Sequence, residues 1–341
     1  MDQAGATTRS RSLDYDRTIG LATMEGRGFF FPSDTDLGKD GRIFTVSRGI
    51  DIDGRTVRIT VYDLESEFFG TFGGIGDGDG QFTSPTSLAI DSTARVYVAD
   101  EYTHRIVVFE PDGDFVADWG VHGTGPGQLD SPSGLAFDKD DNLYVTDHRN
   151  QRIQKFTRDG QYLSGFGSAG SGEGELNLPW GLTVDARGDL YVADWGNDRV
   201  QRFTAEGDHV ATYGRPGSGD GELRRPADVA VDGDGYVHVA DWGNERVQVF
   251  DPGGGFVAKL RGSATLSPWA QEFLSANVEE AQARATANLE PDTAQFGGDP
   301  HEESAHIEKL FWAPVSVKVD GDGRLYVTES NRHRVQVYRW S

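Results

Sequence analysis

Nine side chains suited to binding or catalysis stand at the ends of short apolar runs in this chain of 341 residues. Three tryptophans, a tyrosine and a histidine accompany four polar or charged groups, and the full set is Arg48, Thr86, Glu101, Tyr102, His148, Trp180, Trp195, Asp228 and Trp242. Aromatic walls with a few convergent polar groups are typical of small-molecule sites. We therefore predict that these residues form one ligand-binding site, if the fold brings them together.

Some of these side chains are also suited to a metal ion. Glu101, His148 and Asp228 offer the carboxylate and imidazole ligands that Ca²⁺ or Zn²⁺ takes. His301 and His306 are further candidates, but they are five residues apart and so do not share one face of a helix. The cofactor stays unknown, with one divalent cation, calcium or zinc, as the open alternative. No compact set of acid, base and nucleophile can be identified, so the catalytic residues stay unknown as well.

An internal repeat of 47 residues determines where these side chains lie. Its first phrase, Pro132-Ser-Gly-Leu-Ala-Phe-Asp138, recurs at Pro85, Pro132, Pro179 and Pro226. A second phrase, Tyr144-Val-Thr-Asp147, keeps step with it, and an arginine follows five residues after the aspartate. A β-rich run and a turn of Pro, Asp and Gly come next, so each copy contains four short strands. Divergent copies at Pro32 and Pro314 bring the number of repeats to six.

These phrases resemble the NHL-repeat family of six-bladed β-propellers. The resemblance implies an all-β fold of four-stranded blades, with blades starting near residues 32, 85, 132, 179, 226 and 314. The last copy ends after its third strand, and Asp16–Gly20 matches the pattern that ends a blade, so the N-terminal segment is predicted to close the ring. We expect a disordered tail over residues 1–12 and a single propeller domain over 13–341.

An insert interrupts the repeat before its last copy. Pro226 and Pro314 are 88 residues apart, which is 41 more than one repeat. Ser267-Pro268 has the form of a helix N-cap, apolar residues then recur at helical spacing from Trp269, and Asp299-Pro300 opens a second short helix. Strand direction puts residues that follow the first-strand prolines and the second-strand acids at one end of the central channel, the upper mouth. We predict that the insert, residues 263–310, forms a helical lid over this mouth.

The repeated acidic and glycine-rich phrases are assigned structural roles. Asp100 with Arg105, and the equivalent pairs in other copies, are predicted to stabilise turns, because one site does not need so many copies. Glycine-rich stretches such as 73–80 occur between blades and lack the lysine of a phosphate-binding loop. Asp232-Gly-Asp-Gly235 lacks the later ligands of a calcium loop and is interpreted as a hairpin turn.

The net charge of −23 comes from 55 Asp and Glu against 32 Lys and Arg. This charge disfavours binding to nucleic acid or to an anionic membrane surface. No apolar run approaches the roughly 20 residues that a membrane-spanning helix needs. The chain has no cysteine, and its first residues lack the pattern of a secretion signal. We therefore expect a cytoplasmic monomer whose partners are a small molecule, a peptide or a protein.

The acidic excess has a particular composition, with 37 Asp, 18 Glu, 26 Arg and only 6 Lys. A carboxylate-rich, lysine-poor surface is suited to molar salt, where screening reduces repulsion between like charges. A halophilic origin would explain this composition, and codon bias in a GC-rich genome is the alternative.

Two classes of function follow from these patterns. The first is a binding scaffold that holds a ligand or partner at the lidded, aromatic upper mouth. The alternative is a metal-assisted lyase or hydrolase, resembling the peptide-amidating lyase or the lactonases, at the same mouth. The resemblance to the amidating lyase implies histidines directly after the first-strand prolines, but those positions hold Ser33, Thr86, Ser133, Trp180, Ala227 and Val315. Whether the chain is an enzyme therefore stays open.

Overall fold

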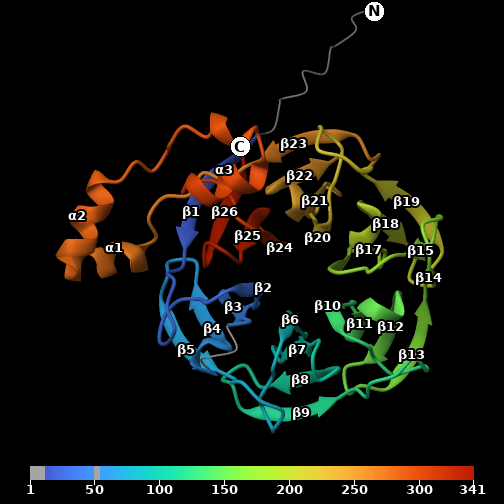
Figure 1. The fold of residues 1–341 in the computed structure, drawn as a ribbon. Coiled ribbons are helices and arrows are strands. Elements are labelled where there is room, and N and C mark those ends of the chain that lie inside the picture. Colours follow the sequence, from blue (N-terminus) through green and yellow to red (C-terminus); the bar gives the residue numbers. More distant parts are fainter. Residues whose placement is uncertain (1–11, 50–53) are drawn as a thin grey trace, which may run out of the picture.

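The computed structural model has six four-stranded antiparallel sheets arranged as blades around a central channel (Figure 1). The structure describes residues 12–49 and 54–341, so all but the last residue of the predicted tail lies outside the described residues. The prediction of a six-bladed β-propeller is confirmed. Within the described residues, no helix is long and apolar enough to cross a membrane.

Each blade runs from an inner strand at the channel to an outer strand at the rim. Blade 1 consists of β2 (Pro32–Leu37), β3 (Arg42–Ser47), β4 (Arg58–Asp63) and β5 (Phe68–Phe72). Blade 2 consists of β6 (Pro85–Ile90), β7 (Val96–Asp100), β8 (Arg105–Phe109) and β9 (Phe115–Trp119). Blade 3 consists of β10 (Pro132–Phe137), β11 (Asn142–Asp147), β12 (Arg152–Thr157) and β13 (Tyr162–Phe166).

The remaining blades follow the same order. Blade 4 consists of β16 (Leu182–Val184), β17 (Leu190–Asp194), β18 (Arg199–Phe203) and β19 (His209–Tyr213). Blade 5 consists of β20 (Pro226–Val231), β21 (Val237–Asp241), β22 (Arg246–Phe250) and β23 (Phe256–Leu260). Blade 6 consists of β24 (Pro314–Val319), β25 (Arg324–Glu329), β26 (Arg334–Trp340) and β1 (Leu13–Ile19). Two short strands, β14 (Ser168–Ala169) and β15 (Glu175–Leu176), pair between blades 3 and 4.

The N-terminal strand closes the ring, as the missing fourth strand of the last repeat predicts. β1 pairs antiparallel with β26, with Leu13 opposite Trp340 and Ile19 opposite Val335. Both ends of the described chain therefore meet in blade 6, and the pairing satisfies an edge strand that would otherwise be open.

Apolar contacts between neighbouring blades form the core. One cluster joins Phe44 and Ile59 of blade 1 to Leu88 and Phe109 of blade 2, and comparable clusters lie at the other junctions. The second and third strands are almost entirely buried, whereas the outer strands are partly exposed. Each blade is thus stabilised by its two neighbours, as expected for a repeat architecture.

The repeated aspartates and arginines stabilise turns, as their number indicates. Asp147 is fully buried, accepts hydrogen bonds from the Asp130 backbone N–H at 2.6 Å and from Arg152 Nε at 2.7 Å, and also pairs with Asn150. The expected pair in blade 2 does not form, because Arg105 bonds to Asp118 at 2.6 Å. There Asp100 accepts from Thr83 and Ser84 backbone N–H groups and from the Thr103 hydroxyl instead.

The insert contains three helices, α1 (Pro268–Ala276), α2 (Val278–Thr286) and α3 (Pro300–His306). Both predicted N-caps are present: Ser267 Oγ accepts from the Ala270 backbone N–H at 3.1 Å, and Asp299 accepts from that of His301 at 2.9 Å. The predicted first helix is divided at Asn277, where α1 ends and α2 begins. The second predicted helix runs from Pro300 to His306.

α1 and α2 do not cover the channel mouth, whereas α3 lies on the upper face, where His301 contacts Glu245 of blade 5 and Arg332 of blade 6 donates to the Ser304 carbonyl at 2.7 Å. α1 and α2 lie beyond the outer edge of the ring, beside blades 6 and 1 (Figure 1). Trp269 is 2% exposed, contacts the rings of Phe29 and Tyr62, and donates from Nε1 to the Ser66 carbonyl at 2.7 Å. The insert follows β23, the outermost strand of blade 5, and precedes β24, the innermost strand of blade 6, so it begins at the rim and ends at the channel. No residue of the insert lines either channel space described below.

Candidate functional site

The upper part of the channel is closed by side chains. The space between the first residues of the inner strands is about 10 Å³, which is at the lower limit for a single water molecule. Thr86 Oγ1 donates to the Pro132 carbonyl at 2.9 Å, and Ser133 Oγ donates to the Trp180 carbonyl at 3.0 Å. These hydroxyls, one residue after the repeat prolines, tie the inner strands of blades 2 and 3 to the next blade and leave no room for a ligand.

The structure divides the nine predicted site residues among several places. Thr86, Trp180 and Asp228 line the constriction of the upper channel. Glu101 and Tyr102 line a separate upper-face cavity of about 410 Å³. Arg48 forms an ion pair with Glu101.

The other three residues lie on the upper loops of different blades. His148 Nδ1 lies 3.0 Å from the Pro179 carbonyl oxygen, and its ring meets Trp180 edge-on. Burial lowers the pKa of His148, although its contact with the Pro179 carbonyl opposes this shift. Trp195 packs under the Arg225 guanidinium at 4.9 Å, and Trp242 begins a 3₁₀ turn of blade 5.

The metal-capable residues named from the sequence also have separate partners. His301 Nδ1 lies 2.7 Å from Glu245 Oε1, and His306 Nδ1 lies 2.8 Å from the Glu302 carbonyl oxygen. Among the residues that the structure describes, none of Glu101, His148, Asp228, His301 and His306 belongs to a group of three or more ligands close enough to share an ion.

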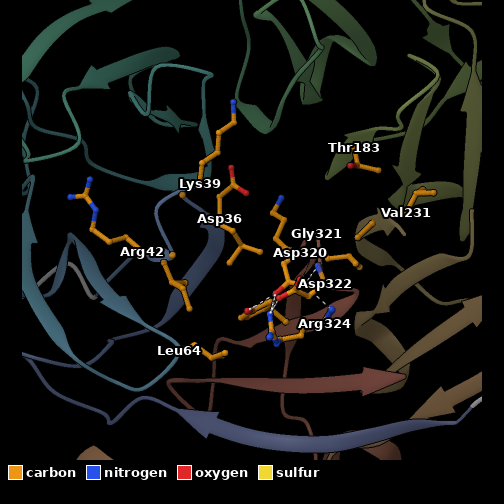
Figure 2. Close-up of a pocket in the computed structure, with 18 residues that line it drawn as sticks. Asp36, Lys39, Arg42, Leu64, Thr183, Val231, Asp320, Gly321, Asp322 and Arg324 are labelled. Atoms are coloured by element: carbon orange, nitrogen blue, oxygen red, sulfur yellow. Dashed lines mark hydrogen bonds and ion pairs between the residues drawn. The ribbon is translucent and has the colours of Figure 1, made fainter. Parts of the chain in front are cut away.

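A larger cavity opens at the other end of the channel, the lower mouth, where the inner strands end. Its volume is about 560 Å³. Asp36 lies on one side and Thr183 and Val231 on the other, while Lys39, Arg42 and the hairpin around Asp322 surround the entrance (Figure 2). Because the constriction closes the upper channel, this cavity has an entrance at the lower mouth and no passage through the ring.

Buried charges occupy the channel between the lower cavity and the constriction. Lys318 Nζ lies 3.6 Å from Asp34 Oδ1 and 3.8 Å from Asp228 Oδ2. The exposed fractions of these side chains are 16%, 5% and 7%, respectively. Asp34 also accepts hydrogen bonds from the Ser87 and Ser316 hydroxyls, both at 2.6 Å. The three charges are therefore held by β24, β2 and β20 of three consecutive blades.

The pKa values in this cluster reflect a balance of burial and charge. Burial lowers the pKa of Lys318, but the nearby carboxylates of Asp34, Asp228 and Asp36 outweigh it, and the net shift is upward. Burial raises the pKa of Asp36 to about 6, although Lys318 opposes the shift. The pKa of Asp228 is raised to about 6 for the same reason, with Asp34 adding to the effect. Lys318 therefore stays charged at neutral pH, while Asp36 and Asp228 change charge in mildly acidic solution.

The repeat itself contained a signal for this cluster that the sequence reasoning missed. Two residues after the proline the six blades have Asp34, Ser87, Gly134, Gly181, Asp228 and Ser316. Four residues after it they have Asp36, Ala89, Ala136, Thr183, Ala230 and Lys318. Charged side chains thus replace the small residues Gly, Ala, Ser or Thr at inward-facing positions of blades 1, 5 and 6 only. Asp228 is predicted at the upper mouth, where it lines the constriction, but the prediction does not include Asp34, Asp36 and Lys318.

Comparisons with known proteins agree with this architecture. A family model described as NHL repeat matches residues 82–109, 223–250 and 311–338. This chain is an NHL-repeat β-propeller. A second family model, described as the SMP-30/gluconolactonase/LRE-like region, matches residues 125–221 of the propeller. A search of curated proteins found no match.

Several solved structures share the fold of this NHL-repeat propeller. A streptogramin B lyase is 10% identical with a TM-score of 0.57, covering 97% of this chain and 98% of that chain. A catalytically inactive virginiamycin B lyase from Staphylococcus aureus, solved with quinupristin, is 12% identical with a TM-score of 0.56, covering 96% and 88%. A Bacteroides thetaiotaomicron protein of unknown function is 16% identical with a TM-score of 0.63, covering 97% and 76%. At these identities the likeness concerns the fold alone.

Proposed function

We propose that this NHL-repeat propeller is a binding module that takes a small, polar, positively charged molecule into the lower mouth of its channel. The observation that carries this proposal is the buried cluster at the inner end of the lower cavity. Asp34, Asp36 and Asp228 contribute three negative charges when ionised, and Lys318 contributes one positive charge, so the net charge is −2. The Lys318 ammonium alone therefore leaves part of the carboxylate charge unbalanced, and a bound cation would reduce this excess negative charge.

The cavity also fits such a ligand in size and lining. A volume of about 560 Å³ lies within the range of roughly 300–1,000 Å³ found for small-molecule sites. Asp36 is half-buried, lines this cavity and presents a carboxylate to it. At the entrance, Asp320 and Asp322 share one partner, Arg324, and Lys39 supplies a second positive charge, so this group of four residues carries no net charge. The unbalanced negative charge therefore lies deep in the cavity, and Asp36 is the group that a ligand ammonium or guanidinium would meet.

Calorimetric titration with a panel of small molecules tests this function. The panel pairs amines such as agmatine and glucosamine with uncharged molecules of similar size such as glucose. We expect an amine to bind at the lower mouth and Asp36→Asn to weaken its binding at least tenfold at pH 7.5. Asp140→Asn is the matched control, because Asp140 is exposed on a hairpin and pairs with the neighbouring Lys139. Absence of amine binding, or equal binding by the Asp36 variant, would contradict the proposal.

A metal-assisted lyase or hydrolase is the second candidate. It is supported by the match to the gluconolactonase-like family model over residues 125–221. The specific observation in its favour is Asp36, whose pKa of about 6 suits proton exchange with a substrate in the lower cavity. A screen of lactones and esters with Ca²⁺, Mn²⁺ or Zn²⁺ tests it. Turnover that disappears in Asp36→Ala would favour the enzyme, whereas amine binding without turnover would favour the binding module.

A further inference from the structure

Two histidines and an aspartate meet on the upper face, at the junction of blades 2 and 3. Asp130 Oδ1 lies 3.6 Å from His104 Nδ1 and 3.8 Å from His122 Nε2. The two imidazole rings stack with their centroids 4.2 Å apart. One ligand atom from each residue lies within 4.8 Å of the other two, and no other group of this kind occurs in the part of the chain that the structure describes.

Comparison with the other blade junctions shows that this combination is specific to one place. The backbone of His122 forms a β-bridge with that of Leu129. At other junctions the position of His122 is occupied by Ala22, Ile75, Ala169 and Pro216. A histidine side chain is therefore not needed for the bridge, and that of His122 is 64% exposed. The residue two positions before the blade proline is Asp130 here, and at the other junctions it is Phe30, Thr83, Asn177, Arg224 and Trp312. The propeller fold thus explains neither His122 nor Asp130.

His104 has a structural role as well. It has a positive φ of 58° at the end of the loop, and its Nδ1 accepts a hydrogen bond from the Ser131 backbone N–H at 2.9 Å. Asp198 and His333 accept an equivalent bond at their own junctions, from Arg225 at 2.7 Å and from Phe31 at 2.9 Å. An acceptor at this position thus recurs at several junctions, but within the described residues it meets a second histidine and an aspartate only at the junction of blades 2 and 3.

The chemistry and spacing of the three groups fit zinc. Zinc takes imidazole nitrogen and carboxylate oxygen at about 2.0–2.2 Å in tetrahedral sites, so neighbouring ligand atoms lie about 3.4 Å apart. The distances of 3.6 and 3.8 Å from Asp130 Oδ1 to the histidine nitrogens are close to that value. Two imidazoles with one carboxylate also favour zinc over calcium or magnesium, which prefer oxygen ligands alone.

We propose that His104, His122 and Asp130 bind one zinc ion. This site is separate from the lower mouth and does not depend on the function proposed there. His104 also lines the upper-face cavity of about 410 Å³, together with Glu101, Tyr102 and Arg149. Water or a ligand in that cavity completes the coordination, because three protein ligands leave one tetrahedral position open.

Zinc binding changes the contact between blades 2 and 3. The imidazole nitrogen that accepts a hydrogen bond has a single lone pair, and this lone pair cannot bind zinc and accept the bond at the same time. Zinc at His104 Nδ1 therefore replaces the hydrogen bond from Ser131. The Ser131 backbone N–H then loses its acceptor. We therefore expect hydrogen exchange at Ser131 to become faster when zinc is bound, which is a readout independent of any enzymatic activity.

The experiment is titration of the full-length, chelator-treated protein with ZnSO₄ alone, followed by calorimetry and by elemental analysis after dialysis. We expect one equivalent of zinc, and we expect Co²⁺ to give the visible absorption of a tetrahedral site. His122→Ala and Asp130→Asn should weaken binding by about 100-fold or more, because loss of a direct ligand exceeds the effect of losing an outer-shell group. His306→Ala is the control, since His306 is also an exposed histidine.

Two results would count against zinc binding by these three residues. Equal zinc affinity in His122→Ala and the unchanged protein would overturn the proposal and indicate binding elsewhere. Absence of binding at 100-fold excess zinc would overturn it as well. Because the His122 side chain is mostly exposed, His122→Ala should keep the circular dichroism spectrum and melting temperature of the unchanged chain, so a loss of binding in this variant reports on the site.

Discussion

Replacement of Lys318 by methionine tests whether its ammonium compensates the buried carboxylates of the channel. Methionine keeps most of the side-chain volume but removes the charge that lies 3.6 and 3.8 Å from Asp34 and Asp228. Removing one partner of a buried ion pair costs about 3–5 kcal/mol. Lys318 is 16% exposed and its distances exceed those of a short hydrogen bond, so we expect a loss at the low end, about 3 kcal/mol at pH 7.5.

The size of this loss should depend on pH. The pKa of Asp36 is raised to about 6 in the folded protein, above its ordinary value of 3.8, so protonation of this group favours the folded state as pH falls. The pKa of Asp228 is raised in the same direction. Both carboxyls are therefore largely neutral at pH 5, where the missing ammonium matters less. We expect the destabilisation by Lys318→Met to fall to about 1 kcal/mol at pH 5.

Urea denaturation followed by tryptophan fluorescence, at pH 7.5 and pH 5, measures both quantities as a difference from the unchanged protein. Lys259→Met is the control, because Lys259 is 48% exposed and its pair with Asp220 is worth roughly 0–1 kcal/mol. A second variant that combines Lys318→Met with Asp228→Asn should recover part of the loss at pH 7.5. An equal loss at both pH values, or no loss at either, would refute the electrostatic reasoning.

Three further predictions concern the scaffold. Trp269→Ala should destabilise the protein by about 3–5 kcal/mol in urea denaturation, because it leaves a cavity at a buried position and breaks the hydrogen bond to Ser66. An effect below about 1 kcal/mol would show that Trp269 does not anchor the helices to the ring. Arg246→Ala should lower the free energy of unfolding by about 3 kcal/mol, because it leaves Asp241 buried without its guanidinium partner. Arg187→Ala is the control: this arginine side chain is 62% exposed, so its loss should change the free energy of unfolding by less than about 1 kcal/mol. If the acidic composition reflects adaptation to salt, the melting temperature should rise steeply with KCl, and a flat response would contradict that interpretation.

The repeat made the fold predictable because each blade is specified by its own 47 residues and by contacts with its neighbours. Closure of the ring by β1 was predictable for a similar reason, since β26 lacked an outer partner within its own repeat. The location of the insert was not predictable from its helical pattern. Ser267 and Asp299 cap helices through local contacts, but Trp269 packs against Phe29 and Tyr62, which are more than 200 positions away in the chain.

The candidate site was harder to predict because it depends on how side chains fill the axis of the ring. Strand direction assigned Thr86 and Trp180 to the upper end of the channel, and they lie there. It did not show that Thr86 would bond across to the next blade and help to close that end. The charged residues of the lower channel were visible as departures from Gly and Ala in the repeat. Whether these side chains meet, however, depends on how the three blades are arranged around the channel.

The position of the charged cluster links the proposed binding to closure of the ring. Lys318 belongs to blade 6, which holds both ends of the described chain, and its carboxylate partners belong to blades 1 and 5 on either side. A cation that pairs with Asp36 would reduce repulsion among these carboxylates and add a contact across this part of the ring. The ligand should therefore stabilise the folded protein by mass action. The ligand should also slow hydrogen exchange in β1 and β26 more than in blade 3. β1 and β26 close the ring by strand pairing, and they belong to blade 6, which carries Lys318. Uniform protection of all blades would indicate that the ligand acts elsewhere.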